Sequence, residues 1–358
     1  MIHSVRDAGP RWLAALALSA GAGWGCSRLH TPIPWMLGPL FTLAVFRVLG
    51  APIVAPPGTR QTGQWIIGTS LGLYFTPVVV REVAGLWYLL LSGAAFAIIV
   101  GYVSGIALAK LADVDRTTGV FASVPGGAAE MATLGERFGA RVDRVAAAQS
   151  LRILLVVAIV PSSFAILGVH GADPYVPGAT AFELRGFVML MAATLAGGIA
   201  ATRLGLPNGF VLGALAVAIP LTASRIDLSA LPTVVSNAGQ CLLGCALGSR
   251  FQPDFLRGAH RFMTAVAVTV LLSIVLSAAF GFVLAAFAGL HPATLILGMA
   301  PGGIAEMCIT AKVLQLGVPL VTGFHVTRVV VLLLSTAPLF DYAKGWRARH
   351  LNDAGPEH

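Results

Sequence analysis

Charge is scarce in this sequence. Of its 358 residues, only 11% are Asp, Glu, Lys or Arg, whereas a typical soluble domain carries about 25%. Hydrophobic residues make up 57% of the chain, and the mean hydropathy is +0.85. So little polar surface cannot coat a water-soluble particle of this size, which argues against any soluble class of protein.

The motifs of common catalytic sites are also missing. The sequence contains no P-loop, no dinucleotide-binding fingerprint and no His–Glu zinc motif. Its four cysteines lie in or beside apolar runs and its eight histidines are scattered, so we expect no copper or iron site. We therefore predict a protein that is not an enzyme, with no catalytic residues, no metal and no cofactor.

Basic residues outnumber acidic ones and give a formal net charge of +8. No block of Lys or Arg is interleaved with aromatic residues in a soluble segment, as a nucleic-acid surface would require. Membrane proteins place Lys and Arg in short cytoplasmic loops, and we interpret the excess in that way. Nucleic acid is not an expected partner.

Long apolar runs are what the sequence has in abundance. A bilayer core roughly 30 Å thick is crossed by about 20 apolar residues in a helix. Runs near this length recur along the chain and predict an all-α polytopic membrane protein. They span residues 12–27, 33–49, 63–80, 86–109, 145–168, 186–202, 208–223, 236–249, 262–288 and 318–340.

The chain also contains one unit written twice. The stretch GQWIIGTSLGLYFTP at 63–77 aligns with GQCLLGCALGSRFQP at 239–253. Upstream, SRLHTPIPWMLGPL at 27–40 aligns with TRLGLPNGFVLGAL at 202–215, in a register shifted by a single residue. The duplication therefore covers nearly the whole chain.

A helix-breaking motif occupies the same place in both halves. SVPGGAAEM at 123–131 aligns with MAPGGIAEM at 299–307, in the same register as the 63–77 stretch. Pro removes a backbone donor, and Gly tolerates dihedral angles that other residues avoid. Each segment is therefore either a re-entrant hairpin of two half-helices or a full crossing helix with a kink. The breaks are expected at Pro125, Gly126 and Gly127 and at Pro301, Gly302 and Gly303.

Loop charge separates these alternatives. With twelve crossings, the Lys and Arg near segment ends divide 11 to 10 between the two sides; with ten crossings and two hairpins, they divide 16 to 5. The five on the outer side are then Arg28, Arg81, Arg185, Arg225 and Lys312. Short cytoplasmic loops hold the excess of Lys and Arg. The count favours two inverted repeats of five transmembrane helices plus one re-entrant hairpin each, with about 10 crossings, 2 hairpins and both termini cytoplasmic.

The duplication sets the expected boundaries. Residues 1–10 form a short cytoplasmic tail, 11–172 the first repeat, 173–185 a linker, 186–341 the second repeat and 342–358 a second cytoplasmic tail. The first apolar run could pass for a signal peptide. Its counterpart in the second half indicates a retained first helix instead.

Charged residues follow both helix breaks at matched positions. Glu130 and Glu306 come three residues after their glycine pairs, and Arg152 and Arg328 lie deep in the next apolar segment. Charges in the hydrocarbon region are costly, and they mark a substrate path, a relay or a paired bridge. One interpretation is that Glu130 pairs with Arg152, and Glu306 with Arg328, to hold hairpin to helix. Another, compatible with the first, is that the glutamates take up H⁺ or Na⁺ while an arginine holds an anionic group.

Two further pairs of polar residues are candidates for the same site. Gln149 and His325 lie three residues before the arginines, on the same helical face. His325 is either a helix-packing histidine or a proton relay. Gln64 and Gln240 begin stretches with a small residue at every fourth position. These stretches are either closely packed helices or helices unwound at a substrate site, with the glutamines as ligands.

The doubled PGGxAEM motif and the two GQxxxGxxLGxxF stretches resemble the AbrB-type membrane protein family, which is named for its AbrB duplication domain. The resemblance covers both copies. Members are labelled as ammonia monooxygenases or linked to regulation of gene expression, but this sequence offers neither metal ligands nor a DNA-binding surface for those roles. The resemblance implies a bacterial inner-membrane location and transport, without a substrate that can be transferred.

We therefore predict an ion-coupled secondary transporter that uses alternating access, with H⁺ or Na⁺ as coupling ion. The expected substrate is a small solute, and an anion is one candidate. The expected partners are the lipid bilayer and a small-molecule or ion substrate, and a homodimer is left open. The alternatives are a membrane-embedded regulator of gene expression without transport and an ammonia monooxygenase-like subunit. The candidate substrate- or ion-binding residues are Pro125, Gly126, Gly127, Glu130, Pro301, Gly302, Gly303, Glu306, Arg152, Arg328, Gln149, His325, Gln64 and Gln240.

Overall fold

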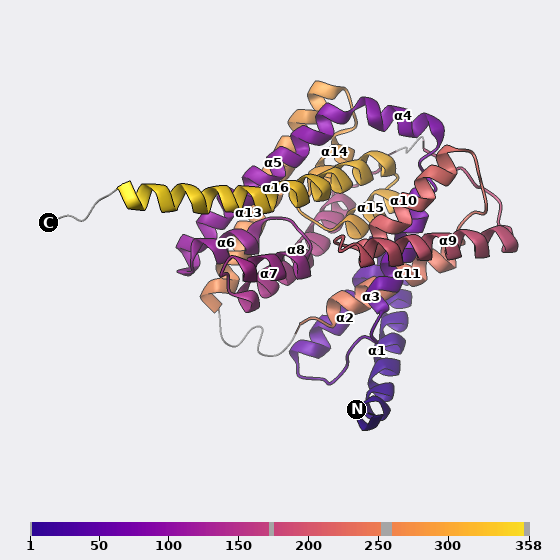
Figure 1. The fold of residues 1–358 in the computed structure, drawn as a ribbon. Helices are drawn as coiled ribbons and strands as arrows, with labels where there is room; N and C mark the ends of the chain where they lie inside the picture. The colour runs from indigo at the N-terminus through magenta and orange to yellow at the C-terminus, as the bar shows by residue number, and fades with distance from the viewer. Residues whose placement is uncertain (1, 172–174, 252–259, 354–358) are drawn as a thin grey trace.

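The computed structural model describes residues 2–171, 175–251 and 260–353 (Figure 1). The chain is 77% helix, and no strand occurs in the described ranges, which confirms the all-helical prediction. In chain order the helices are α1 (Ile2–Arg28), α2 (Pro34–Val48), α3 (Thr59–Gly72), α4 (Pro77–Gly85), α5 (Trp87–Ala112), α6 (Arg116–Ser123), α7 (Ala128–Arg137), α8 (Val142–Ile166), α9 (Leu184–Arg203), α10 (Gly209–Ala223), α11 (Thr233–Gly248), α13 (His260–Ala288), α14 (Pro292–Met299), α15 (Ile304–Val313) and α16 (Val318–Asp353).

Five of the described helices are long and apolar enough to cross a bilayer. They are α5, α8, α9, α13 and the first 18 residues of α16. On α13, large apolar side chains such as Leu272, Val275 and Phe282 are exposed. Apolar surface of this extent is a liability in water, whereas lipid covers it without cost. The chain is a helical membrane protein.

The apolar run 63–80 is not the single segment that the sequence suggested. It divides into α3 and α4, which are bent by 94° relative to each other. Pro77 is the first residue of α4, a position where the missing N–H of proline costs no helical hydrogen bond. The bend therefore coincides with a residue that starts a helix and cannot continue one.

Two other apolar helices are shorter than a bilayer core. α2 and α10 have 15 residues each, which corresponds to about 22 Å, against a hydrocarbon core roughly 30 Å thick. The exact number of crossings therefore stays a prediction.

The helices form two groups, which we call the scaffold and the hairpin body. The scaffold comprises α1, α2, α3, α9, α10 and α11, and the hairpin body comprises α5 to α8 and α13 to α16 (Figure 1). In the scaffold, α2 packs on α11 and α3 packs on α10. In the hairpin body, α5 packs on α13 and α16, while α13 also packs on α8. Each half of the chain thus contributes helices to both groups.

Glycines allow the close helix contacts of the scaffold. A Cβ atom on Gly68 of α3 would lie 2.8 Å from the carbonyl oxygen of Val211 on α10. A Cβ atom on Gly244 of α11 would overlap the carbonyl oxygen of Met36 on α2. The two stretches with small residues at every fourth position are therefore helix-packing faces, and α3 and α11 are continuous through them rather than unwound.

The chain ends belong to longer helices than the sequence suggested. α1 begins at Ile2, and α16 continues to Asp353, so both expected tails are helical as far as they are described. Residues 173–174 of the expected linker, and Pro253 at the end of the second small-residue stretch, lie outside the described residues.

Candidate functional site

Both Pro-Gly-Gly segments fold back on themselves. The hydroxyl of Thr118, near the start of α6, accepts a hydrogen bond of 2.8 Å from the backbone N–H of Arg141, just after α7. In the second half, the hydroxyl of Thr294 accepts the equivalent bond from the N–H of Gly317, at 3.3 Å. A straight helix would separate the two ends of each segment by about 35 Å. We call the folded segments hairpin 1 (residues 116–141) and hairpin 2 (residues 292–317).

In hairpin 1, each glycine of the motif makes room for a side chain that follows it. A Cβ atom on Gly126 would lie 2.6 Å from the end of the Met131 side chain. A Cβ atom on Gly127 would overlap the carboxylate of Glu130. Gly127 precedes the first residue of α7, and Glu130 is its third residue. The carboxylate therefore folds back over the N-terminus of its own helix, where a negative charge is stabilised by the helix dipole.

Hairpin 2 repeats this arrangement. A Cβ atom on Gly302 would lie 2.7 Å from Met307, and one on Gly303 would overlap the carboxylate of Glu306. Glu306 is 8% exposed and is the third residue of α15. The spacing of the PGGxAEM motif thus has the same steric explanation in both halves: the first glycine accommodates the methionine, and the second accommodates the glutamate.

The turn of hairpin 1 is held by two side chains of α8. Arg152 donates from Nη1 to the carbonyl oxygen of Val124 at 3.0 Å and from Nη2 to that of Gly126 at 3.1 Å. Gln149 donates to the carbonyl oxygens of Val124 at 3.0 Å and Phe121 at 2.8 Å. The helix break leaves these carbonyls without helical partners, and the two side chains satisfy them.

The turn of hairpin 2 is held by Arg328 of α16. Its guanidinium donates to the carbonyl oxygen of Ala300 at 2.8 Å and to that of Gly302. It also lies 2.9 Å from Nδ1 of His325. Arginine can only donate, so Nδ1 of His325 accepts, and its Nε2 carries the proton that is donated to the carbonyl oxygen of Leu297 at 3.2 Å. Both imidazole nitrogens are thus used in neutral hydrogen bonding, which favours the helix-packing interpretation of His325.

The expected Glu130–Arg152 and Glu306–Arg328 salt bridges do not form. Within the described ranges, the ion pairs at 4.0 Å or less all involve Asp143 and lie at the start of α8. The arginines are occupied by the turn carbonyls, while the carboxylates fold back over their own helices. Glu306 acts on Arg152 only as a more distant charge.

A polar cluster that the sequence analysis missed joins hairpin 1 to the scaffold. The backbone N–H of Asn208, which precedes α10, donates to Oε1 of Glu130 at 3.3 Å. The side-chain oxygen of Asn208 accepts from Arg60 and from Gln64 of α3, each at 3.0 Å. The other carboxylate oxygen of Glu130 is buried and has no partner among the described residues. Gln64 and Glu130, both predicted from the sequence as site residues, are therefore linked through Asn208.

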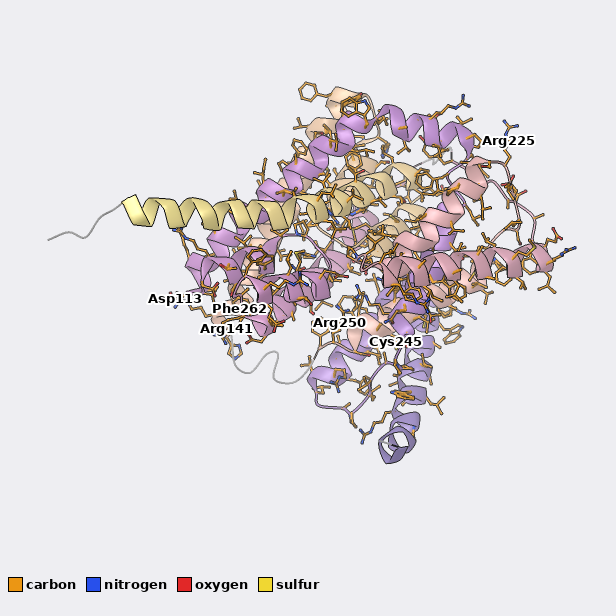
Figure 2. All side chains as sticks on the ribbon, in the orientation of Figure 1. Asp113, Arg141, Arg225, Cys245, Arg250 and Phe262 are labelled. Atoms are coloured by element: carbon orange, nitrogen blue, oxygen red, sulfur yellow. The ribbon has the colours of Figure 1, made fainter. Side chains whose placement is uncertain are left out.

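Other charges that we had assigned to loops also lie at the boundary between the two groups. Arg250, just after α11, interacts electrostatically with Arg60 and with both hairpin glutamates, and Figure 2 places it where the scaffold and the hairpin body meet. Lys312 of hairpin 2 donates to the hydroxyl of Ser70 on α3 at 2.9 Å. Without Arg60, Arg250 and Lys312, the Lys and Arg count is 14 on the cytoplasmic side and 4 on the outer side. The count therefore still favours ten crossings with two hairpins.

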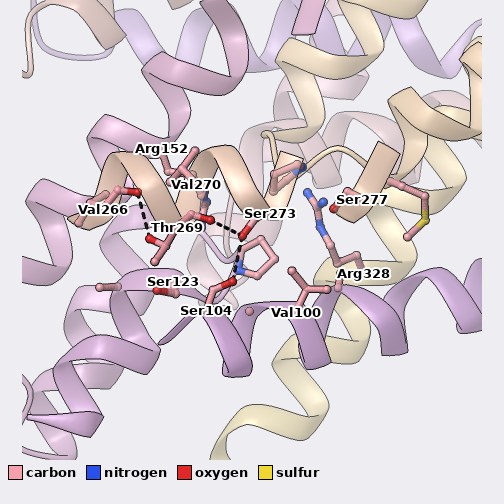
Figure 3. A pocket seen from close by; sticks show the side chains of 16 residues that line it. Val100, Ser104, Ser123, Arg152, Val266, Thr269, Val270, Ser273, Ser277 and Arg328 are labelled. Atoms are coloured by element: carbon pink, nitrogen blue, oxygen red, sulfur yellow. Dashed lines mark hydrogen bonds between the residues drawn. The ribbon is translucent and has the colours of Figure 1, made fainter. Parts of the chain in front are cut away.

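The turns of the two hairpins meet at one cavity. Pro125 and Pro301 both line it, together with Arg152 and Arg328 and with residues of α5 and α13 (Figure 3). The two halves of the motif therefore come together in space. Gln240 does not join them: it is buried in α11 and makes no side-chain hydrogen bond within the described ranges.

Metal-ligating side chains do not gather at this site. Among the residues that the structure describes, no three His, Cys, Asp or Glu side chains come close enough together to hold a metal ion. The chemistry available at the hairpins is that of buried guanidinium groups, carboxylates and hydroxyls.

Comparison with known proteins gives the family. The family described as "Transition state regulatory protein AbrB" matches residues 35–344. The chain belongs to the AbrB family. A relative from Bacillus subtilis (strain 168), named "Uncharacterized protein YhjN", is 27% identical, with 91% of each chain covered. The protein named "Putative regulator AbrB" from Escherichia coli (strain K12) is 22% identical, with 91% of this chain and 94% of the relative covered. The resemblance drawn from the doubled motif is thereby confirmed.

Proposed function

We propose that this AbrB-family protein is a secondary transporter of the bacterial inner membrane. A small solute would cross by alternating access, driven by H⁺ or Na⁺, through a central site formed by the two hairpins. The observation that carries the proposal is that two interrupted helices, at matching positions of a duplicated chain, turn at one shared cavity. Interrupted helices at corresponding positions of two halves are typical of a transporter site.

The proposal includes two inverted repeats with about ten crossings and both termini in the cytoplasm. Matched contacts support it, because each hairpin is closed by the same threonine bond and held by the same arginine. The scaffold helices also exchange partners between halves, α3 with α10 and α11 with α2. Such exchange is what a pseudo-two-fold axis in the membrane plane would produce.

Single cysteines test the orientation of the repeats. With Cys26, Cys241, Cys245 and Cys308 replaced by serine, one cysteine each is placed at the exposed positions Arg137 and Val313. An impermeant maleimide applied from either face should label Arg137→Cys from the cytoplasm and Val313→Cys from the opposite side. Labelling of both from one face would remove the inverted repeat and leave the family assignment untouched.

Alternating access would come from movement of the hairpin body against the scaffold. Within the described ranges, two side-chain hydrogen bonds join the two groups near the hairpins, those of Glu130 with Asn208 and of Lys312 with Ser70. Both are single polar contacts of a kind that can break and re-form at low cost. The hairpin turns, in contrast, are tied to their own group by the arginines and would move with it.

The two glutamates are the proposed coupling residues. A buried carboxylate is costly unless it is neutralised, and one oxygen of Glu130 has no partner among the described residues. Uptake of H⁺ or Na⁺ at Glu130 and Glu306 would neutralise both hairpins. The same residues contact or face the scaffold, so neutralisation would change the contact that movement must break.

Reconstituted protein tests coupling directly. Proteoliposomes are exposed to a panel of small organic and inorganic anions under a proton or sodium gradient, and currents are recorded on a solid-supported membrane. We expect a gradient-dependent current for at least one solute, abolished by Glu130→Gln and by Glu306→Gln. Glu136→Gln, at an exposed position of α7, is the matched control and should leave the current unchanged. Wild-type currents in both hairpin variants would contradict the coupling role.

A membrane-embedded regulator is the second candidate, because the family description contains the words "regulatory protein" and one relative is named a regulator. It would alter a partner's signal or gene expression with no flux. Expression of the Glu306→Gln variant in a strain that lacks the protein separates the two candidates. If the protein regulates without transport, the variant should restore the regulatory effect; if it is a transporter, the variant should restore neither solute flux nor any effect that depends on flux. An ammonia monooxygenase-like subunit, the third class, would be favoured by stoichiometric copper or iron in the purified protein.

A further inference from the structure

The cavity between the two hairpin turns is lined by polar side chains to which the proposed function has not yet assigned a ligand. It has a volume of about 20 Å³ and lies between α5 and α13. Arg152 and Arg328 border it, and Figure 3 shows them on either side of the hydrogen-bonded hydroxyls of Ser104 and Ser273. A space of this size holds one particle about as large as a water molecule.

Both arginines keep an unused donor beside this cavity. Arg152 and Arg328 are each 4% exposed. Their terminal nitrogens bond the turn carbonyls, but the Nε atom of each is buried and has no hydrogen-bond partner among the described residues. The two guanidinium groups also repel each other electrostatically. Two buried guanidinium groups of the same charge therefore border one small space.

Hydroxyl groups line the cavity from both halves: Ser104 and Ser123 belong to the first half, and Thr269, Ser273 and Ser277 to the second. Ser273 and Ser277 lie on α13 and line the cavity. In the register of the duplication, the equivalent residues of α5 are Ala97 and Gly101, which provide space and no donor. Ser277 is buried, and its hydroxyl makes no hydrogen bond within the described ranges. At these two register positions α13 thus carries hydroxyls where α5 leaves room, and the Ser273 hydroxyl already donates to the carbonyl oxygen of Thr269 at 2.8 Å.

The charge of this lining selects the occupant. No carboxylate lies within 4.0 Å of either arginine in the described ranges, and buried charges without a counter-charge are costly. We propose that the cavity binds a small monovalent anion, either a halide ion or the carboxylate group of a small acid, between the two arginines and the hydroxyl of Ser277. This deepens the proposed function, since it makes the solute an anion, and it places the anion apart from the glutamates that take the coupling ion.

Binding can be measured without transport, so the two proposals fail separately. The purified full-length protein in detergent is titrated with sodium chloride, sodium formate or sodium acetate, with sodium gluconate holding the ionic strength constant. Thermal unfolding and calorimetry report the dissociation constant. We expect saturable stabilisation. A response to chloride alone identifies a halide site, and a response to formate or acetate identifies a carboxylate site; either supports the proposal.

Variants of the lining test the location. Ser277→Ala should weaken binding about tenfold, as expected for the loss of one charge-assisted hydrogen bond. Ala97→Leu should fill the cavity and abolish binding. Ala95→Leu, at an exposed position on the other side of α5, is the matched control and should bind as the wild type does. Equal dissociation constants in all four proteins, or a linear response without saturation, would overturn the proposal and leave water as the occupant.

The combination of results is decisive for each proposal. Saturable binding that the lining variants weaken, in a protein without measurable flux, supports the anion site and counts against transport. Flux that is independent of every anion in the panel, with no saturable binding, counts against the anion site and leaves transport standing.

Discussion

The two hairpins share their backbone design but meet different surroundings. Around Glu130 of hairpin 1, the scaffold supplies Asn208 and Arg60. At the positions that correspond to these two in the duplication, the scaffold carries Ile33 and Ser236. Ile33 and Asn208 both precede a helix in the left-handed conformation, with φ of 47° and 49°. The local fold has thus been kept in both halves, while the polar link to the hairpin is present in only one.

The turns differ in how many side chains hold them. In hairpin 1, the carbonyl oxygen of Val124 has two side-chain donors, Gln149 and Arg152. In hairpin 2, the carbonyl oxygen of Ala300 has one, because His325 replaces the glutamine and bonds Leu297 instead. The comparison teaches that the second turn depends on a single side chain and the first does not.

The largest effect is therefore expected from Arg328→Gln. This change removes the donors to two turn carbonyls and to His325, and we expect a loss of about 3 kcal/mol in the free energy of unfolding. Arg152→Gln should cost roughly half as much, because Gln149 still bonds Val124. Thermal and chemical unfolding in mixed micelles measures both.

A double variant sharpens this comparison. Gln149→Ala combined with Arg152→Gln removes both native side-chain donors of the first turn, and its loss of stability should approach that of Arg328→Gln. If Arg152→Gln alone already costs as much as Arg328→Gln, Gln149 contributes nothing to the stability of hairpin 1. The two turns would then differ in their hydrogen bonds but not in their stability.

The second glycine of each motif comes next in expected effect. Gly127→Ala and Gly303→Ala force a methyl group into the carboxylate of Glu130 or Glu306, and such overpacking typically costs about 1–3 kcal/mol. The first glycines, Gly126 and Gly302, lie against the flexible side chain of a methionine, so their alanine variants should cost less than about 1 kcal/mol. Melting temperatures of the four variants give the ranking, and a larger loss at either first glycine would contradict it.

Much of the fold could be predicted because it depends on patterns along the chain. Apolar runs, the constant register between the two halves and the Pro-Gly-Gly breaks are local or periodic features, and they located the helices and the interruptions. The small residues at every fourth position likewise predicted close helix packing. The bend after Gly72 was missed, because an apolar run records hydrophobicity and not direction.

The contacts of the arginines could not be predicted in the same way. The matched positions of Glu130 and Arg152 in the two halves, both within apolar segments, suggested a pair. The carbonyl oxygens that a helix break sets free are not visible in the side-chain pattern, yet they are the acceptors that the arginine uses. Arg60 had one available signal, since it lies four residues before Gln64 on the same helical face. Asn208 is contributed by the other half of the chain, and only the exchange of helices between halves brings it to hairpin 1.

The polar link of hairpin 1 can be converted into its counterpart. Asn208→Ile removes the partners of Arg60, Gln64 and Glu130 and copies Ile33, which tolerates the same left-handed backbone. We expect hairpin 1 to loosen from the scaffold, with a loss of about 1–2 kcal/mol in local stability. Hydrogen exchange of the amides in α7 should then be about tenfold faster.

The reverse exchange is the control. Ile33→Asn should leave the exchange of α15 unchanged, because the scaffold beside hairpin 2 has Ser236 where the first half has Arg60. Unchanged protection of α7 in Asn208→Ile would mean that apolar packing, and not the asparagine, holds hairpin 1 in place.

The smallest effect is expected where the hairpins close. Thr118 accepts from the N–H of Arg141 at 2.8 Å and donates to Asp115 at 2.6 Å, whereas the bond that Thr294 accepts from Gly317 is longer, at 3.3 Å. Thr118→Val should therefore cost about 1–1.5 kcal/mol and Thr294→Val about 0.5 kcal/mol, with faster exchange of the Arg141 or Gly317 amide as the local measure.

Serine variants decide what the threonine contributes. Thr118→Ser keeps the hydroxyl and should restore protection of the Arg141 amide. Hairpin 1 also has stacked rings of Phe121 and Phe138, with centroids 5.9 Å apart, where hairpin 2 has Leu297 and Leu314. Full protection of the Arg141 amide in Thr118→Val would show that these rings close hairpin 1 without the hydroxyl. The threonine bond would then contribute more in hairpin 2, although the bond of Thr294 with Gly317 is the longer one.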